Sequence, residues 1–135
     1  MSSTKNSHHH TILVVDDDGV LRMYAAEILR DAGYEVIEAA DTAAAMATLE
    51  ARTDIRLLFT DVQLPPGRDG LSLARQVTDL WPDVLLLITS GGPKILDDDV
   101  PHEARFITKP YSDRQLLGHI EAMIADRCAA DQVLR

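Results

Sequence analysis

The segment Ile-Leu-Val-Val-Asp-Asp-Asp at residues 12–18 sets the pattern for the whole chain. Its four apolar residues, three of them β-branched, are typical of a buried strand, and the run stops abruptly at three acids. Apolar residues then recur at helical spacing, namely Leu21, Tyr24, Ala25, Ile28, Leu29 and Ala32. The pattern predicts a buried strand, an acidic loop and an amphipathic helix that ends at Gly33.

The same alternation repeats along the chain. Further strands are expected at 34–39, 56–60, 84–89 and 105–108, and further helices at 41–51, 70–81 and 112–128. Asp41 and Ser112 are the expected N-caps of two of these helices, and Asp18 is read as the cap of the first rather than as a ligand. Apolar strands separated by helices predict an α/β fold, in which helices cover both faces of a parallel sheet.

Length and composition indicate one globular domain. The chain has 135 residues, of which 46% are apolar and 26% are charged. We expect a polar lead-in without fixed structure at 1–10, a domain at 11–128 and a short tail at 129–135. His8, His9 and His10 lie in the lead-in and are read as solvated side chains rather than a metal site.

Charge and cysteine content exclude several classes of protein. The net charge is −9, and no basic patch is present to displace the counterions of nucleic acid. No apolar run approaches the roughly 18 residues that span a bilayer, and the N-terminus lacks the layout of a secretory signal. The single cysteine, Cys128, cannot form an internal disulfide, which fits a cytoplasmic protein.

Polar groups follow four of the five predicted strands. They are Asp16 to Asp18, Asp61, Thr89 with Ser90, and Lys109. Carboxyl ends of parallel strands share one edge of a sheet, and ligands bind there. Three carboxylates at one edge repel each other, and one lysine does not balance them, so we expect a divalent cation; oxygen ligands of this kind suit Mg²⁺.

A cation, a lysine and a hydroxyl around one carboxylate form a cradle for a phosphoryl group, and an aspartate can act as the nucleophile. Five short motifs carry this pattern in order, and together they resemble the receiver domain of two-component response regulators. They are Ile-Leu-Val-Val-Asp-Asp-Asp at 12–18, Phe-Thr-Asp-Val-Gln-Leu-Pro at 59–65, Asp-Gly-Leu at 69–71, Ile-Thr-Ser at 88–90 and Phe-Ile-Thr-Lys-Pro at 106–110.

The resemblance covers about residues 11–128 and implies a flavodoxin-like (βα)5 fold with strand order 2-1-3-4-5. It implies that Asp61 accepts a phosphoryl group from a sensor histidine kinase or a histidine phosphotransfer protein. It further implies that Mg²⁺ is held by Asp16, Asp17, Asp61 and the backbone carbonyl of Gln63.

The resemblance also assigns the groups that bind the phosphoryl oxygens. Thr89 and Lys109 would each contact one oxygen, and Pro110 stands where the family has a cis-proline. Phe106 has two interpretations, a core residue of a short strand or an aromatic that turns inward when Thr89 moves. The chain is then a phosphoacceptor and not an enzyme, with an unidentified downstream protein target and a last helix that is a candidate surface for weak homodimerisation.

Three departures from the family pattern stand out. The loop after Asp61 is one residue longer, at Pro65-Pro66-Gly67, and the segment 91–103 is broken by Pro93 and Pro101. Gly91 has no side chain to guide an attacking water, so we expect slow self-dephosphorylation.

Two other functions stay open at the sequence level. Asp16-Asp17-Asp18-Gly19-Val20 also resembles the opening motif of haloacid-dehalogenase-like phosphatases, with Asp16 as the nucleophile and Asp18 as the acid–base. That enzyme would use Thr89 or Ser90, Lys109 and the Asp97-Asp98 pair, and it leaves Asp61 unexplained. The other alternative is a receiver-like interaction module that takes no phosphoryl group.

Overall fold

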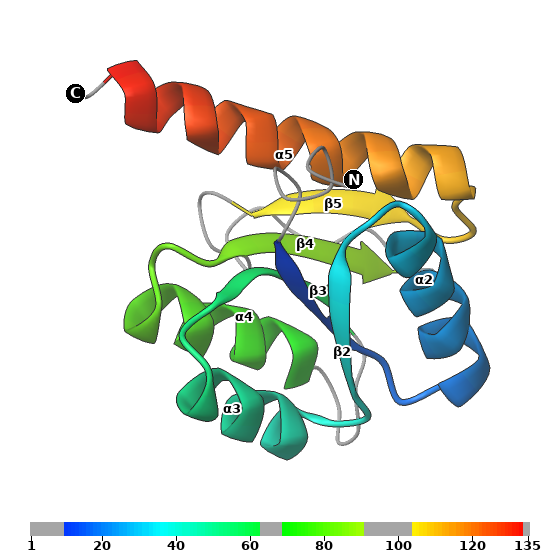
Figure 1. Ribbon diagram of the computed structural model, residues 1–135. Coiled ribbons are helices and arrows are strands. Elements are labelled where there is room, and N and C mark those ends of the chain that lie inside the picture. Colours follow the sequence, from blue (N-terminus) through cyan, green and yellow to red (C-terminus); the bar gives the residue numbers. More distant parts are fainter. Residues whose placement is uncertain (1–9, 63–68, 91–103, 134–135) are drawn as a thin grey trace.

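Five parallel strands form one sheet in the order β2-β1-β3-β4-β5, as the family resemblance implies (Figure 1). The computed structural model describes residues 10–62, 69–90 and 104–133. The strands are β1 (Thr11–Val15), β2 (Glu35–Ala39), β3 (Ile55–Asp61), β4 (Leu85–Ser90) and β5 (Arg105–Thr108), and the helices are α2 (Gly19–Asp31), α3 (Thr42–Ala51), α4 (Asp69–Leu80) and α5 (Asp113–Val133).

Alternation along β1 divides the core into two layers. Ile12 and Val14 pack with the buried faces of α2 and α5, whereas Leu13 and Val15 pack with α3 and α4 on the opposite face of the sheet (Figure 1). Successive side chains of a strand point to opposite faces, so a continuous apolar run fits a strand covered on both sides. The predicted two-sided parallel sheet is confirmed.

Side-chain caps begin the helices where the sequence predicts them. Asp18 Oδ1 accepts hydrogen bonds from Val20 N at 2.9 Å and Leu21 N at 3.2 Å, so its predicted role as the N-cap of α2 is confirmed. Asp41 Oδ1 likewise accepts a hydrogen bond from Ala44 N at the start of α3.

The start of α5 carries a reciprocal pair of hydrogen bonds. Gln115 N donates to Ser112 Oγ at 3.1 Å, and Ser112 N donates to Gln115 Oε1 at 2.8 Å, which is a capping box. At the other end of a helix, Gly33 follows α2 with a φ of 102°, a conformation that favours glycine. The start of α5 and the end of α2 therefore match the sequence prediction.

The last helix is longer than expected. The spacing of apolar residues suggests an end near Cys128, but α5 continues to Val133. The intervening segment, 129–132, is Ala-Ala-Asp-Gln and contains neither glycine nor proline to stop a helix. Predictions for residues 1–9, Gln63 and 91–103 lie outside the described residues. Among the helices that the structure describes, none has the length and apolar character needed to cross a membrane.

Candidate functional site

Three neighbouring strands bring the predicted site residues to one edge of the sheet. Asp16 directly follows β1, Asp61 ends β3, and Thr89 lies opposite Asp61 on β4. Backbone hydrogen bonds extend the ladder beyond the strands, because Asp16 N donates to Ala39 O and Val62 N donates to Thr89 O. All three side chains are buried, so the sheet itself sets the spacing of the site.

Lys109 forms an ion pair with the predicted phosphoacceptor. It follows β5, and its Nζ donates a hydrogen bond to Asp61 Oδ2 at 2.6 Å while lying 3.7 Å from Asp16 Oδ2. Burial lowers the pKa of Lys109, but the hydrogen bond to Asp61 and the charges of Asp61 and Asp16 outweigh it and raise that pKa overall. The lysine is therefore a cation at neutral pH. The Lys109–Pro110 peptide bond is cis, as the resemblance implies.

Asp16 lies in a setting that opposes its negative charge. Burial raises the pKa of its carboxyl, and the carboxylates of Asp61 and Asp17 add to that rise. A hydrogen bond of 2.9 Å from Asp18 N to Asp16 Oδ1, together with the charge of Lys109, acts in the opposite direction but does not cancel it. A further positive charge would stabilise the ionised carboxyl.

The donor set fits Mg²⁺. Asp16 and Asp61 present buried carboxylates at the same edge, and Asp17 lies next to them with an exposed side chain. Within residues 10–62, 69–90 and 104–133, no group of three or more acidic, histidine or cysteine side chains is placed to hold a metal ion. Mg²⁺ does not need such a cluster, because it commonly takes one or two carboxylates and completes its shell with water and phosphate oxygens.

Thr89 carries a buried hydroxyl with an unmet hydrogen-bonding requirement. Its Oγ1 has no hydrogen-bond partner within the described part of the chain, although the residue is only 2% exposed. An unpaired buried polar group costs about 1–3 kcal/mol, so such a group is rare in a folded protein. The hydroxyl lies on the strand next to Asp61, at the edge of the sheet where the sequence predicts that a phosphoryl group binds.

Phe106 is not a core residue, so that interpretation of the sequence is wrong. The residue is 39% exposed, whereas its neighbour Ile107 is buried with the core residues of α5. Because neighbouring residues of a strand point to opposite faces, Ile107 takes the α5 side and leaves Phe106 on the other. The switch role remains a prediction.

Gly70 is needed by the close packing of α4 on β3. A Cβ at this position would lie 1.9 Å from the carbonyl oxygen of Asp61 and 2.7 Å from Val62 Cα. Gly70 N donates to Val62 O at 3.2 Å, so the first turn of α4 lies directly on the backbone that follows Asp61. The Asp-Gly-Leu motif at 69–71 marks this position in the sequence. Only the structure shows that the glycine is required by the close approach to Asp61 and Val62.

Tyr111 was not anticipated from the sequence. Its ring packs against Phe59 at a centroid distance of 5.7 Å and against Tyr24 at 6.3 Å. Burial, followed by the charge of Asp16, raises the pKa of Tyr111 to about 12. A pocket of about 360 Å³ beside the ion pair is lined by Leu21, Tyr24, Lys109, Pro110 and Tyr111.

The chain is similar to response regulator receiver proteins over most of its length. The family model of the response regulator receiver domain matches residues 12–121. The response regulator receiver protein CpdR of Brucella abortus is 33% identical over 116 residues, which are 84% of this chain and 95% of CpdR. The sensor kinase CckA of the same organism is 29% identical over 126 residues, which are 90% of this chain but 13% of CckA.

Solved structures agree with the sequence matches. A CheY-like response regulator receiver domain from Methanospirillum hungatei JF-1 superimposes with a TM-score of 0.80 at 26% identity. The aligned region covers 90% of this chain and 98% of that one. The likeness therefore extends over nearly the whole of both chains.

Proposed function

Since the chain belongs to the response regulator receiver domain family of two-component systems, we propose that it accepts a phosphoryl group on Asp61. The donor is the phosphohistidine of a sensor histidine kinase or of a histidine phosphotransfer protein. One oxygen of the Asp61 carboxylate attacks phosphorus, the P–N bond breaks, and the imidazole nitrogen keeps the electron pair. The product is an acyl phosphate.

One arrangement supports the proposal above all others. The Asp61 carboxylate bonds the cationic Lys109 at 2.6 Å, and Thr89, whose buried hydroxyl is unpaired within the described residues, is the register partner of Asp61 on the adjacent strand. After transfer, Lys109 can move its hydrogen bond from the Asp61 carboxylate to a phosphoryl oxygen. The Thr89 hydroxyl can donate a hydrogen bond to another phosphoryl oxygen. Positioned donors of this kind are the main contribution a protein makes to phosphoryl transfer.

Asp16, Asp17 and Asp61, with the carbonyl of Gln63, are the residues that would hold Mg²⁺. The ion, when bound, supplies positive charge that offsets the charge of the transferring phosphoryl oxygens. The protein's own share is to keep two carboxylates buried at one edge, where β1 and β3 pair in parallel from Ile12–Leu57 to Val15–Thr60.

The phosphorylated domain acts as a switch for another protein and not as an enzyme, with self-dephosphorylation that is slow. The phosphatase alternative needs Asp18 as a mobile acid–base. Asp18 instead caps α2 through two backbone hydrogen bonds, a role that favours the receiver mechanism.

Replacement of Asp61 by asparagine tests the proposal. With acetyl phosphate and Mg²⁺, intact-mass measurement should show one phosphoryl group on the wild type and none on Asp61→Asn. Chelation of Mg²⁺ should abolish labelling of the wild type as well. Sustained hydrolysis of a phosphate ester by Asp61→Asn, lost in Asp16→Asn, would instead establish the phosphatase.

The inert interaction module requires a separate test. Beryllofluoride with Mg²⁺ mimics the aspartyl phosphate, and we expect it to shift the NMR resonances of Thr89 and Lys109. An unlabelled wild type whose resonances stay unchanged would indicate a module that takes no phosphoryl group.

A further inference from the structure

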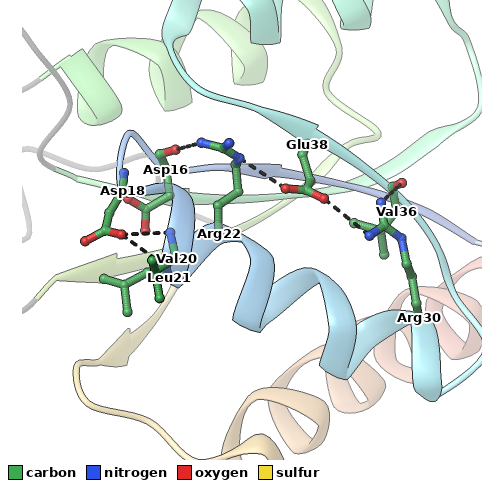
Figure 2. Close-up of polar contacts among 8 residues, drawn as sticks. All are labelled: Asp16, Asp18, Val20, Leu21, Arg22, Arg30, Val36 and Glu38. Atoms are coloured by element: carbon green, nitrogen blue, oxygen red, sulfur yellow. Dashed lines mark hydrogen bonds and ion pairs between the residues drawn. The ribbon is translucent and has the colours of Figure 1, made fainter.

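A chain of charged side chains links the acidic loop to the edge of the sheet (Figure 2). Arg22 of α2 donates from Nη1 to the carbonyl oxygen of Asp16 at 2.8 Å and from Nε to Glu38 Oε1 at 3.1 Å. Glu38 of β2 also pairs with Arg30, at 3.3 Å, and Arg30 in turn donates to Val36 O at 3.1 Å. Only the Arg22 end of this chain reaches the site.

Within the described part of the chain, three hydrogen bonds hold Asp16, and each uses a different group of this residue. Its N–H donates to Ala39 O, its Oδ1 accepts from Asp18 N, and its carbonyl oxygen accepts from Arg22. The first two place the Asp16 residue itself. The third acts on the peptide unit that joins Asp16 to Asp17, and that unit is planar, so holding its oxygen sets the direction in which Asp17 leaves the strand.

Glu38 gives Arg22 the fixed geometry that this task needs. The side chains of Arg22 and Glu38 are 21% and 25% exposed, so the ion pair is partly shielded from water. A guanidinium can bond two partners at once through its rigid fork, which an ammonium group cannot reproduce. Arg22 therefore connects the carbonyl of a metal-ligand candidate to a strand of the sheet rather than to mobile solvent.

We propose that Arg22 is a positioning residue for the cation site. It holds the Asp16–Asp17 peptide so that both carboxylates stand ready for the divalent ion, and Glu38 orients it. The inference rests on the proposed function, because that function supplies the need for the ion. Arg22 touches neither the phosphoryl group nor Lys109 in this account, and it acts through the backbone of Asp16.

The sign of its effect separates this role from simple electrostatics. Arg22 is positively charged, so removing it would by charge alone strengthen the binding of a cation nearby. Loss of positioning has the opposite effect, because the ligands must then be ordered when the ion binds. Residues that orient metal ligands commonly affect metal affinity by 10–100-fold.

The experiment compares two arginines of the same chain. Arg22→Met removes the bond to Asp16, whereas Arg30→Met removes a bond to the same Glu38 without touching the acidic loop. Calorimetric titration with Mg²⁺ should give a dissociation constant about tenfold higher for Arg22→Met, at the low end of the range for groups that orient ligands. Arg30→Met should leave the dissociation constant unchanged.

A second measurement needs no metal. Amide hydrogen exchange of Asp18 N–H, which bonds to Asp16 Oδ1, should accelerate in metal-free Arg22→Met and stay at the wild-type rate in Arg30→Met. Arg22→Lys keeps the charge and can donate to one partner, so its dissociation constant should lie between those of the wild type and Arg22→Met. If urea unfolding shows that Arg22→Met is not folded, the test uses Arg22→Lys in its place.

The result that overturns the inference is a dissociation constant of Arg22→Met equal to or below that of the wild type, with unchanged exchange. If Arg22→Lys is the only variant used, a Mg²⁺ dissociation constant equal to that of the wild type overturns the inference as well. A wild type that binds Mg²⁺ and is labelled on Asp61 keeps the proposed function intact in either case. A wild type that neither binds Mg²⁺ nor is labelled overturns both.

Discussion

At the scale of single residues, two threonines on adjacent strands differ in one respect. Thr60 Oγ1 donates to Asp61 O at 3.0 Å, whereas Thr89 Oγ1 has no partner in the part of the chain that is described. Both residues are almost completely buried. The hydroxyl of Thr60 therefore contributes to the unmodified fold, and that of Thr89 does not.

We expect valine to have opposite effects at these two positions. Thr89→Val removes an unpaired polar group and should raise the free energy of unfolding by about 1 kcal/mol, whereas Thr60→Val breaks a buried bond and should lower it by about as much. Urea unfolding measures both. Thr89→Val should also lose the NMR response of Lys109 to beryllofluoride. A destabilised Thr89→Val would show that its hydroxyl has a partner.

Tyr111 should ionise later than an ordinary tyrosine. Burial, then the charges of Asp16 and other neighbours, raise its pKa from 10.0 to about 12, and its unfolded-state value is the lower one. The folded state thus holds this proton more tightly, so the stabilisation is fully present below pH 10 and is lost as the pH rises toward 12.

Ultraviolet titration of the wild type minus Tyr111→Phe should isolate that late ionisation. The stability difference between the two proteins, measured by urea unfolding, should move in favour of Tyr111→Phe above pH 10. A Tyr111 component that titrates together with a free tyrosine would contradict the burial argument.

At the scale of elements, the contact between α4 and β3 depends on Gly70. A methyl group there meets backbone atoms of Asp61 and Val62, which cannot rotate away as a side chain could. Gly70→Ala must push the first turn of α4 off the strand, and we expect a loss of stability of at least about 1–3 kcal/mol. Labelling of Asp61 by acetyl phosphate should slow as its backbone moves.

Gly118 offers the matched control. It lies within α5, and a Cβ there meets nothing within 4 Å. Gly118→Ala should raise the free energy of unfolding by about 0.5–1 kcal/mol, because alanine has less conformational freedom to lose in a helix. Equal destabilisation by both substitutions would mean that the close approach at Gly70 is not the cause.

The elements themselves were predictable because their signals are local. The acids after β1, the Asp18, Asp41 and Ser112 caps and the stop at Gly33 all depend on residues only a few positions away. The strand order followed from family resemblance, and the structure confirms it.

What the sequence could not predict depends on how one element meets another in the folded chain. The face taken by Phe106 is settled by α5, which covers Ile107, and the role of Gly70 is settled by the backbone of Asp61. Arg22 follows the acids by about one helical turn, and no sequence pattern indicates that its side chain bonds the carbonyl of Asp16. Local periodicity contains none of this information.

At the scale of the whole molecule, the charge of −9 and the buried carboxylates predict a specific response to Mg²⁺. A ligand that binds only the folded state adds about 2.7 kcal/mol to stability at a hundred times its dissociation constant. Thermal unfolding in Mg²⁺ should therefore shift upward by more than in NaCl of the same ionic strength. Equal shifts would mean that general screening of repulsion explains the whole effect.

The site joins residues that are far apart along the chain, and this has a consequence for the order of synthesis. Asp61 and its partner Lys109 are separated by 48 positions, and β5 must pair with β4 before Lys109 can face Asp61. A nascent chain that has not yet emerged beyond β5 thus carries Asp61, the proposed acceptor, without the lysine. Such a chain should not be labelled by a phosphodonor. Pulse labelling of ribosome-bound chains of increasing length would show the length at which Asp61 can first be phosphorylated.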